Sequence, residues 1–162
     1  SSRTAYPTQL LVQQEKRSLG GIDIEFIFSN DGHSRGDVLM WLPDQKIIFG
    51  GDVLASDWIP IMTPSGNVPH LIETLKLVIK LNPAVVLTGH GEVTTVKSVI
   101  RDADFLEQTW NLVKEGYDKG EKTEDILSQF LRQLGPKYQS QYKDFDSSAS
   151  YLIDMMVKKQ KE

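Results

Sequence analysis

The sequence predicts an α+β fold in which helices cover an antiparallel or mixed sheet. Three observations predict this class. Branched and aromatic residues alternate with polar ones in the first third of the 162-residue chain, hydrophobic spacing changes to three and four residues after about residue 66, and one short apolar run lies between two helical segments. A single domain is expected, because roughly 100–200 residues are typical of one hydrophobic core.

The expected strands lie near the beginning of the chain. Two apolar runs, TQLLVQ (8–13) and IDIEFIF (22–28), flank the turn signal Gly20-Gly21. The next two, DVLMWL (37–42) and KIIFGG (46–51), are joined by the short connection PDQ, which is typical of an antiparallel hairpin. These patterns together predict a β-meander.

Four helices are expected after the meander. Pro69 suits a first helical turn and Asn82-Pro83 a helix end, after which AVVL (84–87) reads as a short buried strand. Apolar spacing then predicts a long helix from about residue 96 that stops between residues 116 and 120. The remaining two are expected from a cap at Thr123 to Gly135-Pro136, and from about Ser148 to the lysine-rich end.

Composition limits the possible partners. The 22 acidic and 18 basic residues give a formal net charge of −4 with no long basic run, so nucleic acid is not an expected partner. No stretch of about 18 apolar residues occurs, and a membrane is not expected either. Because the chain has no cysteine, a metal ion would have to be held by histidine and carboxylate groups. Nothing in the sequence indicates a cellular location.

Three candidate metal ligands follow or precede predicted strands. His33 comes before the hairpin, Asp52 ends it, and His90 follows the strand at 84–87. Strand ends can meet at one edge of a sheet, so we expect the three side chains to lie within about 7 Å of one another. Imidazole nitrogen and carboxylate oxygen suit zinc, and iron or manganese are alternatives. The pattern identifies no catalytic or substrate-binding residue.

Three motifs in this region resemble those of one enzyme family. GHSRGD (32–37), FGGD (49–52) and LTGHGE (87–92) resemble, in order and on the expected elements, the later three metal-ligand motifs of metallo-β-lactamase-fold hydrolases. The resemblance implies that His33 belongs to a first metal site, that Asp52 bridges two ions and that His90 binds the second.

The same resemblance implies the domain organisation. The family fold is a four-layer αββα sandwich, and this chain is similar to half of it. Residues 1–120 would form the C-terminal half of that domain, and residues 121–162 a helical C-terminal extension that we expect to take no part in the site.

One part of the family pattern is absent. The family's first motif, His-x-His-x-Asp-His, supplies further ligands, and the chain has only one other histidine, His70. The resemblance therefore implies the C-terminal portion of a dinuclear hydrolase, inactive without its N-terminal half. Its substrate would be a small ester, thioester, lactone or β-lactam. The apolar face of the strands near 38–42 and 47–49 would need covering by that N-terminal half or by a dimer mate.

Other interpretations remain open. A non-catalytic interaction module or fold relic could retain part of the metal motif, and metal content would distinguish it from a hydrolase. The tripeptide RGD (35–37) suggests cell adhesion, but so short a motif arises by chance. Ser34 lacks the Gly-x-Ser-x-Gly surroundings of a nucleophile. Asp57 and Trp58 either line a substrate pocket or simply pack.

Overall fold

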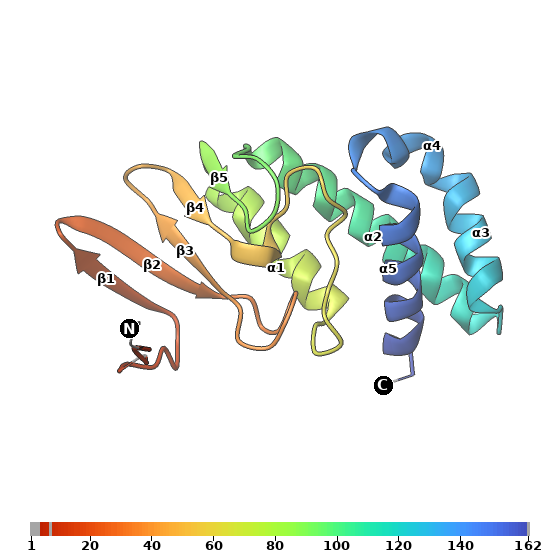
Figure 1. Cartoon of the computed structure of the whole chain (residues 1–162), viewed down its shortest axis with the longest axis horizontal. Coiled ribbons are helices and arrows are strands. Elements are labelled where there is room, and N and C mark those ends of the chain that lie inside the picture. The colour runs from red at the N-terminus through yellow and green to blue at the C-terminus, as the bar shows by residue number, and fades with distance from the viewer. Residues whose placement is uncertain (1–3, 7, 162) are drawn as a thin grey trace.

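The computed structural model describes residues 4–6 and 8–161. Its described part contains one mixed sheet with the strand order β1-β2-β3-β4-β5 and a set of helices beside it, so the predicted α+β class is confirmed. The strands are β1 (Glu15–Leu19), β2 (Ile22–Phe28), β3 (Val38–Leu42), β4 (Ile47–Phe49) and β5 (Val85–Leu87). Figure 1 shows the sheet on one side of the molecule and the C-terminal helices on the other.

The first four strands form the predicted antiparallel meander. Gly20 and Gly21 join β1 to β2 with φ angles of 60° and 83°, which glycine adopts at little cost and which suit a two-residue hairpin turn. The prediction of a strand at 8–13 is wrong, because no strand forms over these residues. Leu10 and Val12 are 82% and 83% exposed there, without the neighbouring side chains that would favour a strand.

A helical crossover links the last two strands. After β4, a 3-10 turn, η1 (Gly51–Val53), leads into a long loop and then α1 (Val68–Leu81). The Asn67 side chain caps α1 by accepting the His70 N–H at 3.0 Å, and Pro69 lies in its first turn as predicted. β5 then runs parallel to β4. This crossover brings the ends of β4 and β5 to the same edge of the sheet.

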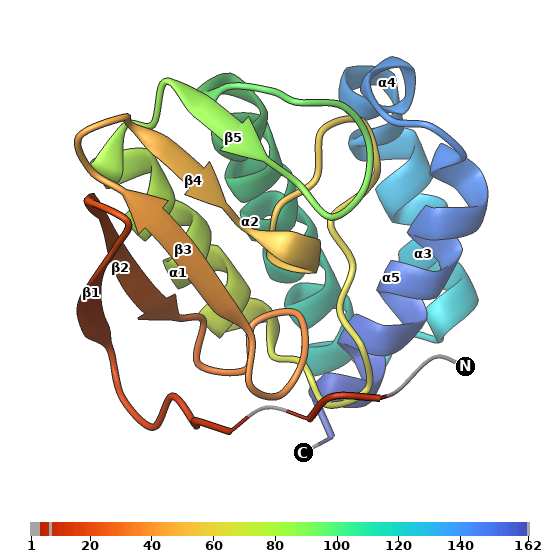
Figure 2. The same ribbon diagram turned by 60° about the vertical axis from the view of Figure 1, so that its left-hand side comes forward.

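The helices α1 and α2 (Val96–Asp118) cover one face of the sheet. Figure 2 shows both helices behind the strands. The core includes alternate residues of the central strands, which are fully or almost fully buried: Leu39, Trp41, Ile48 and Val86.

The opposite face of the sheet carries a row of apolar side chains. Phe26 pairs with Met40, Met40 with Phe49, and Phe49 with Leu87, so the row crosses four strands. Met40 and Phe49 are exposed, and no helix of the described residues covers this face in Figure 2. Among the described residues, helices therefore cover only one face of the sheet.

The C-terminal helices form a second group against α2. They comprise α3 (Thr123–Gln133), α4 (Gly135–Tyr138), the 3-10 turn η2 (Gln139–Gln141) and α5 (Phe145–Lys159). Rings of Phe105 on α2 and Phe130 on α3 meet edge to face at 6.0 Å between centroids. Tyr142 and Phe145 extend the same aromatic cluster.

The sequence predicts the bounds of these helices only approximately. α3 ends at Gln133, which agrees with the predicted stop at Gly135-Pro136. A further short helix, α4, starts at Gly135, because proline suits a first helical turn as well as it breaks an existing helix. The last helix begins at Phe145 rather than near Ser148. Among the described residues, no helix has both the length and the apolar character needed to cross a membrane.

Candidate metal centre

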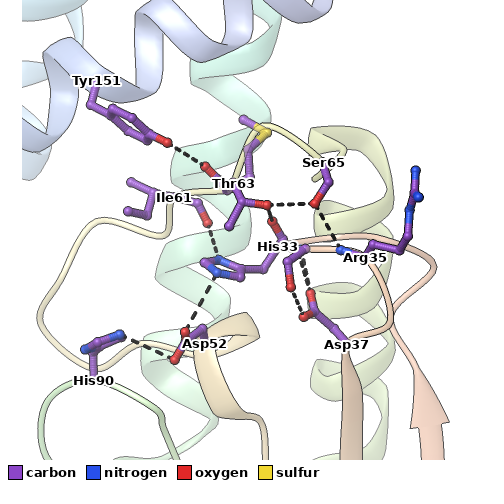
Figure 3. A network of polar contacts seen from close by, with 11 residues as sticks. His33, Arg35, Asp37, Asp52, Ile61, Thr63, Ser65, His90 and Tyr151 are labelled. Atoms are coloured by element: carbon purple, nitrogen blue, oxygen red, sulfur yellow. Dashed lines mark hydrogen bonds and ion pairs between the residues drawn. The ribbon is translucent and has the colours of Figure 1, made fainter.

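The structure brings the three candidate ligands together at one edge of the sheet. His33 comes from the loop between β2 and β3, Asp52 from η1, and His90 from the loop after β5. One carboxylate oxygen of Asp52, Oδ2, lies 3.8 Å from His33 Nε2, and the other, Oδ1, lies 3.4 Å from His90 Nε2. Figure 3 shows the Asp52 carboxylate between the two imidazoles.

His33 is held in one orientation by the backbone. Its Nδ1 lies 2.9 Å from the carbonyl oxygen of Ile61. A carbonyl only accepts, so Nδ1 carries a proton and donates, and in the neutral imidazole this leaves the lone pair on Nε2, the nitrogen that faces Asp52. A histidine that binds a metal ion through one nitrogen usually donates from the other in this way. The His33 side chain is 13% exposed, whereas that of His90 is 67% exposed.

The residues beside His33 stabilise its loop. Asp37 accepts the backbone N–H of His33 at 3.0 Å, and it also accepts the backbone N–H and the hydroxyl of Ser34 at 2.6 and 2.5 Å. Its carboxylate is thus engaged within the loop, while Arg35 points away from Asp52 in Figure 3. Asp37 is not presented as the free carboxylate of an adhesion motif, and the Ser34 hydroxyl is engaged in the same loop.

Two glycines allow the ligand loops to approach closely. A Cβ placed on Gly89 would lie 2.2 Å from Asp52 Oδ1, and one placed on Gly91 would lie 2.0 Å from Ser56 Oγ. Gly91 also has a φ of +91°, which disfavours other residues. The segment carrying His90 therefore packs directly on the segment carrying Asp52, with Ala55 bridged to His90 through the backbone.

Residues 54–62, named the site loop here, border the three ligands. Arg101 on α2 donates through Nη2 to the Ser56 carbonyl at 2.5 Å. The same guanidinium donates to Asp102 Oδ1 through Nε at 2.8 Å and Nη2 at 2.7 Å, and it lies 4.4 Å from the centre of the Tyr142 ring. Ser56 in turn accepts the Glu92 N–H at 2.8 Å. A buried charge network thus links α2 to the segment that follows His90.

Burial dominates the titration of this network. Asp102 is 2% exposed, and burial raises the pKa of its carboxyl to about 7 against the opposing effect of Arg101. Burial also raises the pKa of Tyr142, whose hydroxyl donates to Asp102 Oδ1 at 2.8 Å. By contrast, a hydrogen bond from Lys143 lowers the pKa of Asp57 on the site loop.

The C-terminal extension contacts the site loop. The Lys143 N–H donates to the Asp57 carbonyl at 2.7 Å, and the Tyr151 hydroxyl on α5 donates to the Met62 carbonyl at 3.3 Å. Ser148 on α5 lines the same cavity as the three candidate ligands. Residues 121–162 therefore lie against the loop beside the candidate ligands, a proximity that the sequence does not indicate because long-range contacts of this kind leave no trace in local sequence patterns.

The donors present fit a metal ion but do not enclose one. Within residues 4–6 and 8–161, no three histidine or acidic side chains form a group that could hold a metal ion by themselves. Asp52 shared between His33 and His90 offers two protein ligands on each side, whereas zinc takes three or four. His70, the remaining histidine, is not among the residues of this cavity. The arrangement can therefore form only part of a coordination sphere.

Comparison with other proteins identifies the fold. No family model and no curated protein matches the sequence. Among solved structures, a metallo-β-lactamase from Pontibacter korlensis is 24% identical and has a TM-score of 0.52, covering 64% of this chain and 50% of its own. A metallo-β-lactamase family protein from Thermus thermophilus is 11% identical over 93% of this chain and 49% of its own, with a TM-score of 0.62.

A third structure matches nearly the whole chain. The stereoselective inverting sec-alkylsulfatase Pisa1 from Pseudomonas sp. is 14% identical with a TM-score of 0.68, covering 95% of this chain and 26% of its own. This chain spans half or less of the length of each of these three proteins. It has the metallo-β-lactamase fold, and it corresponds to the C-terminal half of that fold.

Proposed function

We propose that this chain is the C-terminal portion of a dinuclear metal-dependent hydrolase, with His33, Asp52 and His90 as metal ligands. The observation that carries the proposal is the position of the Asp52 carboxylate, whose two oxygens face the Nε2 atoms of different histidines. A carboxylate in this position is suited to bridge two ions. The donation from His33 Nδ1 to the Ile61 carbonyl also supports it, because it leaves Nε2 free to coordinate.

Zinc is the preferred ion for this donor set, and iron or manganese are alternatives. Two such ions, when bound, would supply Lewis acidity and lower the pKa of a water molecule. The chain's own residues have a positioning role. Ile61 fixes the His33 ring, Gly89 lets Asp52 approach the His90 loop, and Ala55 and Ser56 fix the backbone around His90.

The proposed substrates are small esters, thioesters, lactones or β-lactams. Two of the similar structures are named as a metallo-β-lactamase and a sec-alkylsulfatase, which supports a small substrate with a hydrolysable bond. We further propose that residues 1–120 form half of the catalytic domain and residues 121–162 its helical extension, since α3–α5 share an aromatic cluster with α2.

The chain alone would be inactive, and an N-terminal half would complete it. Two ligands on each side of Asp52 are too few to hold zinc tightly. The apolar row of Phe26, Met40, Phe49 and Leu87, in which Met40 and Phe49 are exposed, supports a partner layer on the uncovered face of the sheet. We propose that the segment carrying the His-x-His-x-Asp-His motif supplies both the missing ligands and this layer.

A zinc titration tests the proposal. Zinc uptake is measured by equilibrium dialysis for the chain alone and after mixing it with an N-terminal half carrying the His-x-His-x-Asp-His motif. Tight uptake and ester hydrolysis are expected only in the mixture. His33→Ala and Asp52→Asn should abolish both, and His70→Ala, the matched control outside the site, should retain them.

Equal zinc uptake with and without the N-terminal half would contradict the proposal. So would uptake in the mixture that His33→Ala and Asp52→Asn leave unchanged. Either result would favour the non-catalytic interaction module.

A further inference from the structure

A cavity of about 360 Å³ opens beside the candidate ligands. His33, Asp52 and His90 form one part of its lining, and Ser148 of α5 contributes another. The rest comes from consecutive and nearly consecutive residues of the site loop: Leu54, Ala55, Trp58, Ile59, Pro60 and Ile61. The cavity thus extends from the proposed metal ligands to the C-terminal extension.

The lining supplied by the site loop and α5 is uncharged. Apart from the three candidate ligands, its only polar side chains are the Ser148 hydroxyl and the Trp58 indole. Asp57 of the site loop forms an ion pair with Lys143 at 2.5 Å, and neither residue lines the cavity. A charged group in this part of the cavity would lose its hydration without gaining a partner, whereas an apolar group would be stabilised.

The cavity wall is held in place before any ligand binds. Three carbonyls of the site loop accept hydrogen bonds from elsewhere in the fold: Ser56 from Arg101, Asp57 from the Lys143 N–H, and Met62 from Tyr151. Ile59, a residue of the site loop, is buried. A preformed apolar cavity loses little free energy to ordering when it binds a ligand.

We propose that this cavity binds an uncharged alkyl or acyl chain of the substrate, with the hydrolysable bond placed at Asp52. The inference rests on the proposed function, because it assigns the substrate class of that site. The volume accommodates roughly a dozen non-hydrogen atoms, on the basis of about 30 Å³ for each water-sized group. A chain of about eight carbons therefore fits, with its far end toward Ser148 and Trp58.

The test uses neutral probes that need no metal ion. The 162-residue chain is titrated with 1-butanol, 1-hexanol and 1-octanol, and the indole N–H signal of Trp58 is followed by NMR, with Trp41 and Trp110 as internal references. The Trp58 signal is assigned with Trp58→Phe. Affinity should rise about fourfold for each added methylene, which corresponds to ~0.8 kcal/mol.

Two variants locate the binding. Ile61→Asp places a charge in the lining, and Ser148→Trp fills the end of the cavity; each should weaken 1-octanol binding at least tenfold. Ser150→Trp is the matched control, because Ser150 is exposed on the same helix and does not line the cavity. Ile61 is partly exposed, so Ile61→Asp is expected to fold. It therefore tests the inference even if Ser148→Trp does not fold.

The outcomes separate this inference from the proposed function. Absence of a chain-length effect, or 1-octanol binding that both variants leave unchanged, overturns the inference. If one of these two results is found while the reconstituted protein still takes up zinc tightly, the inference about the cavity is overturned and the proposed function stands. Selective 1-octanol binding without zinc uptake overturns the proposed function and leaves a site for apolar ligands.

Discussion

Gly89 lies directly against the carboxylate of Asp52. A Cβ on Gly89 would come within 2.2 Å of Asp52 Oδ1 and 2.7 Å of the Gly51 backbone carbon, so no other residue fits without moving η1. The Gly89 N–H also donates to the Gly51 carbonyl at 2.7 Å. The loop after β5 and the turn after β4 therefore share one small contact, which places His90 and Asp52 together.

Gly89→Ala should weaken zinc binding by the reconstituted protein at least tenfold. The added methyl group displaces Asp52 from between the two histidines, because its neighbours include backbone atoms that cannot rotate away. The measurement is the zinc dissociation constant from equilibrium dialysis. Gly135→Ala is the control, since a Cβ there meets nothing within 4 Å. Unchanged affinity in Gly89→Ala would show that Asp52 does not depend on this contact.

Stability should fall as pH rises through neutrality because of Asp102. Burial raises the pKa of its carboxyl from 3.8 to about 7, so between these pH values the folded chain holds a proton that the unfolded chain releases. The associated stabilisation is complete below about pH 4 and is lost as pH rises through about 7. Raising the pH from about 5 to about 8 should lower the free energy of unfolding of the wild type by about 2–3 kcal/mol relative to Asp102→Asn. Urea unfolding at both pH values measures this difference. An equal change in the free energy of unfolding for the wild type and Asp102→Asn would contradict the prediction.

Arg101→Met should destabilise the chain by roughly 3–5 kcal/mol at about pH 8. It leaves the buried Asp102 carboxylate without its ionic partner and removes the hydrogen bond to the Ser56 carbonyl. Urea unfolding supplies the free energy. Arg132→Met, on the exposed side of α3, should change it by about 0.5 kcal/mol or less. If both substitutions lowered the free energy of unfolding by similar amounts, the hydrogen bonds and the ion pair of Arg101 would not stabilise the fold more than an exposed arginine does.

Phe49→Lys should reduce self-association of the isolated chain. Phe49 is exposed in the apolar row on the uncovered face of the sheet, where a lysine opposes edge or face pairing with a second molecule. Sedimentation velocity over a range of protein concentrations measures the effect. Leu77→Lys, at a similarly exposed position on α1, should leave association unchanged. If both variants associate like the wild type, this face is not the contact.

Local patterns in the sequence predict most of the sheet and of α1. The turn at Gly20-Gly21, the hairpin between β3 and β4, and the helix start at Pro69 each depend on neighbouring residues, and each appears in the structure. The prediction of a strand at 8–13 is wrong because strand propensity depends on a partner surface, which Leu10 and Val12 lack. β1, with the sequence EKRSL, is too polar to be recognised as a strand from composition.

The candidate site was predictable only in its side-chain ligands. Their position at strand ends indicated a common edge, and the structure brings His33, Asp52 and His90 to that edge. The Ile61 carbonyl that orients His33 is a backbone group and leaves no signature in the sequence. Arg101 meets Ser56 across 45 residues, and Ser148 reaches the cavity only because α3–α5 fold back on α2.

The parallel pairing of β4 and β5 has a consequence for recognising distant relatives. Two parallel neighbours cannot be joined by a tight turn, so the polypeptide must return across the sheet between Asp52 and His90, and this return needs about a dozen residues or more. Natural variants can lengthen this stretch at the loop before α1 but cannot delete it. Geometry therefore sets a lower limit on the spacing between the two residues, so searches for remote homologues should penalise spacings near or below that limit far more heavily than longer ones.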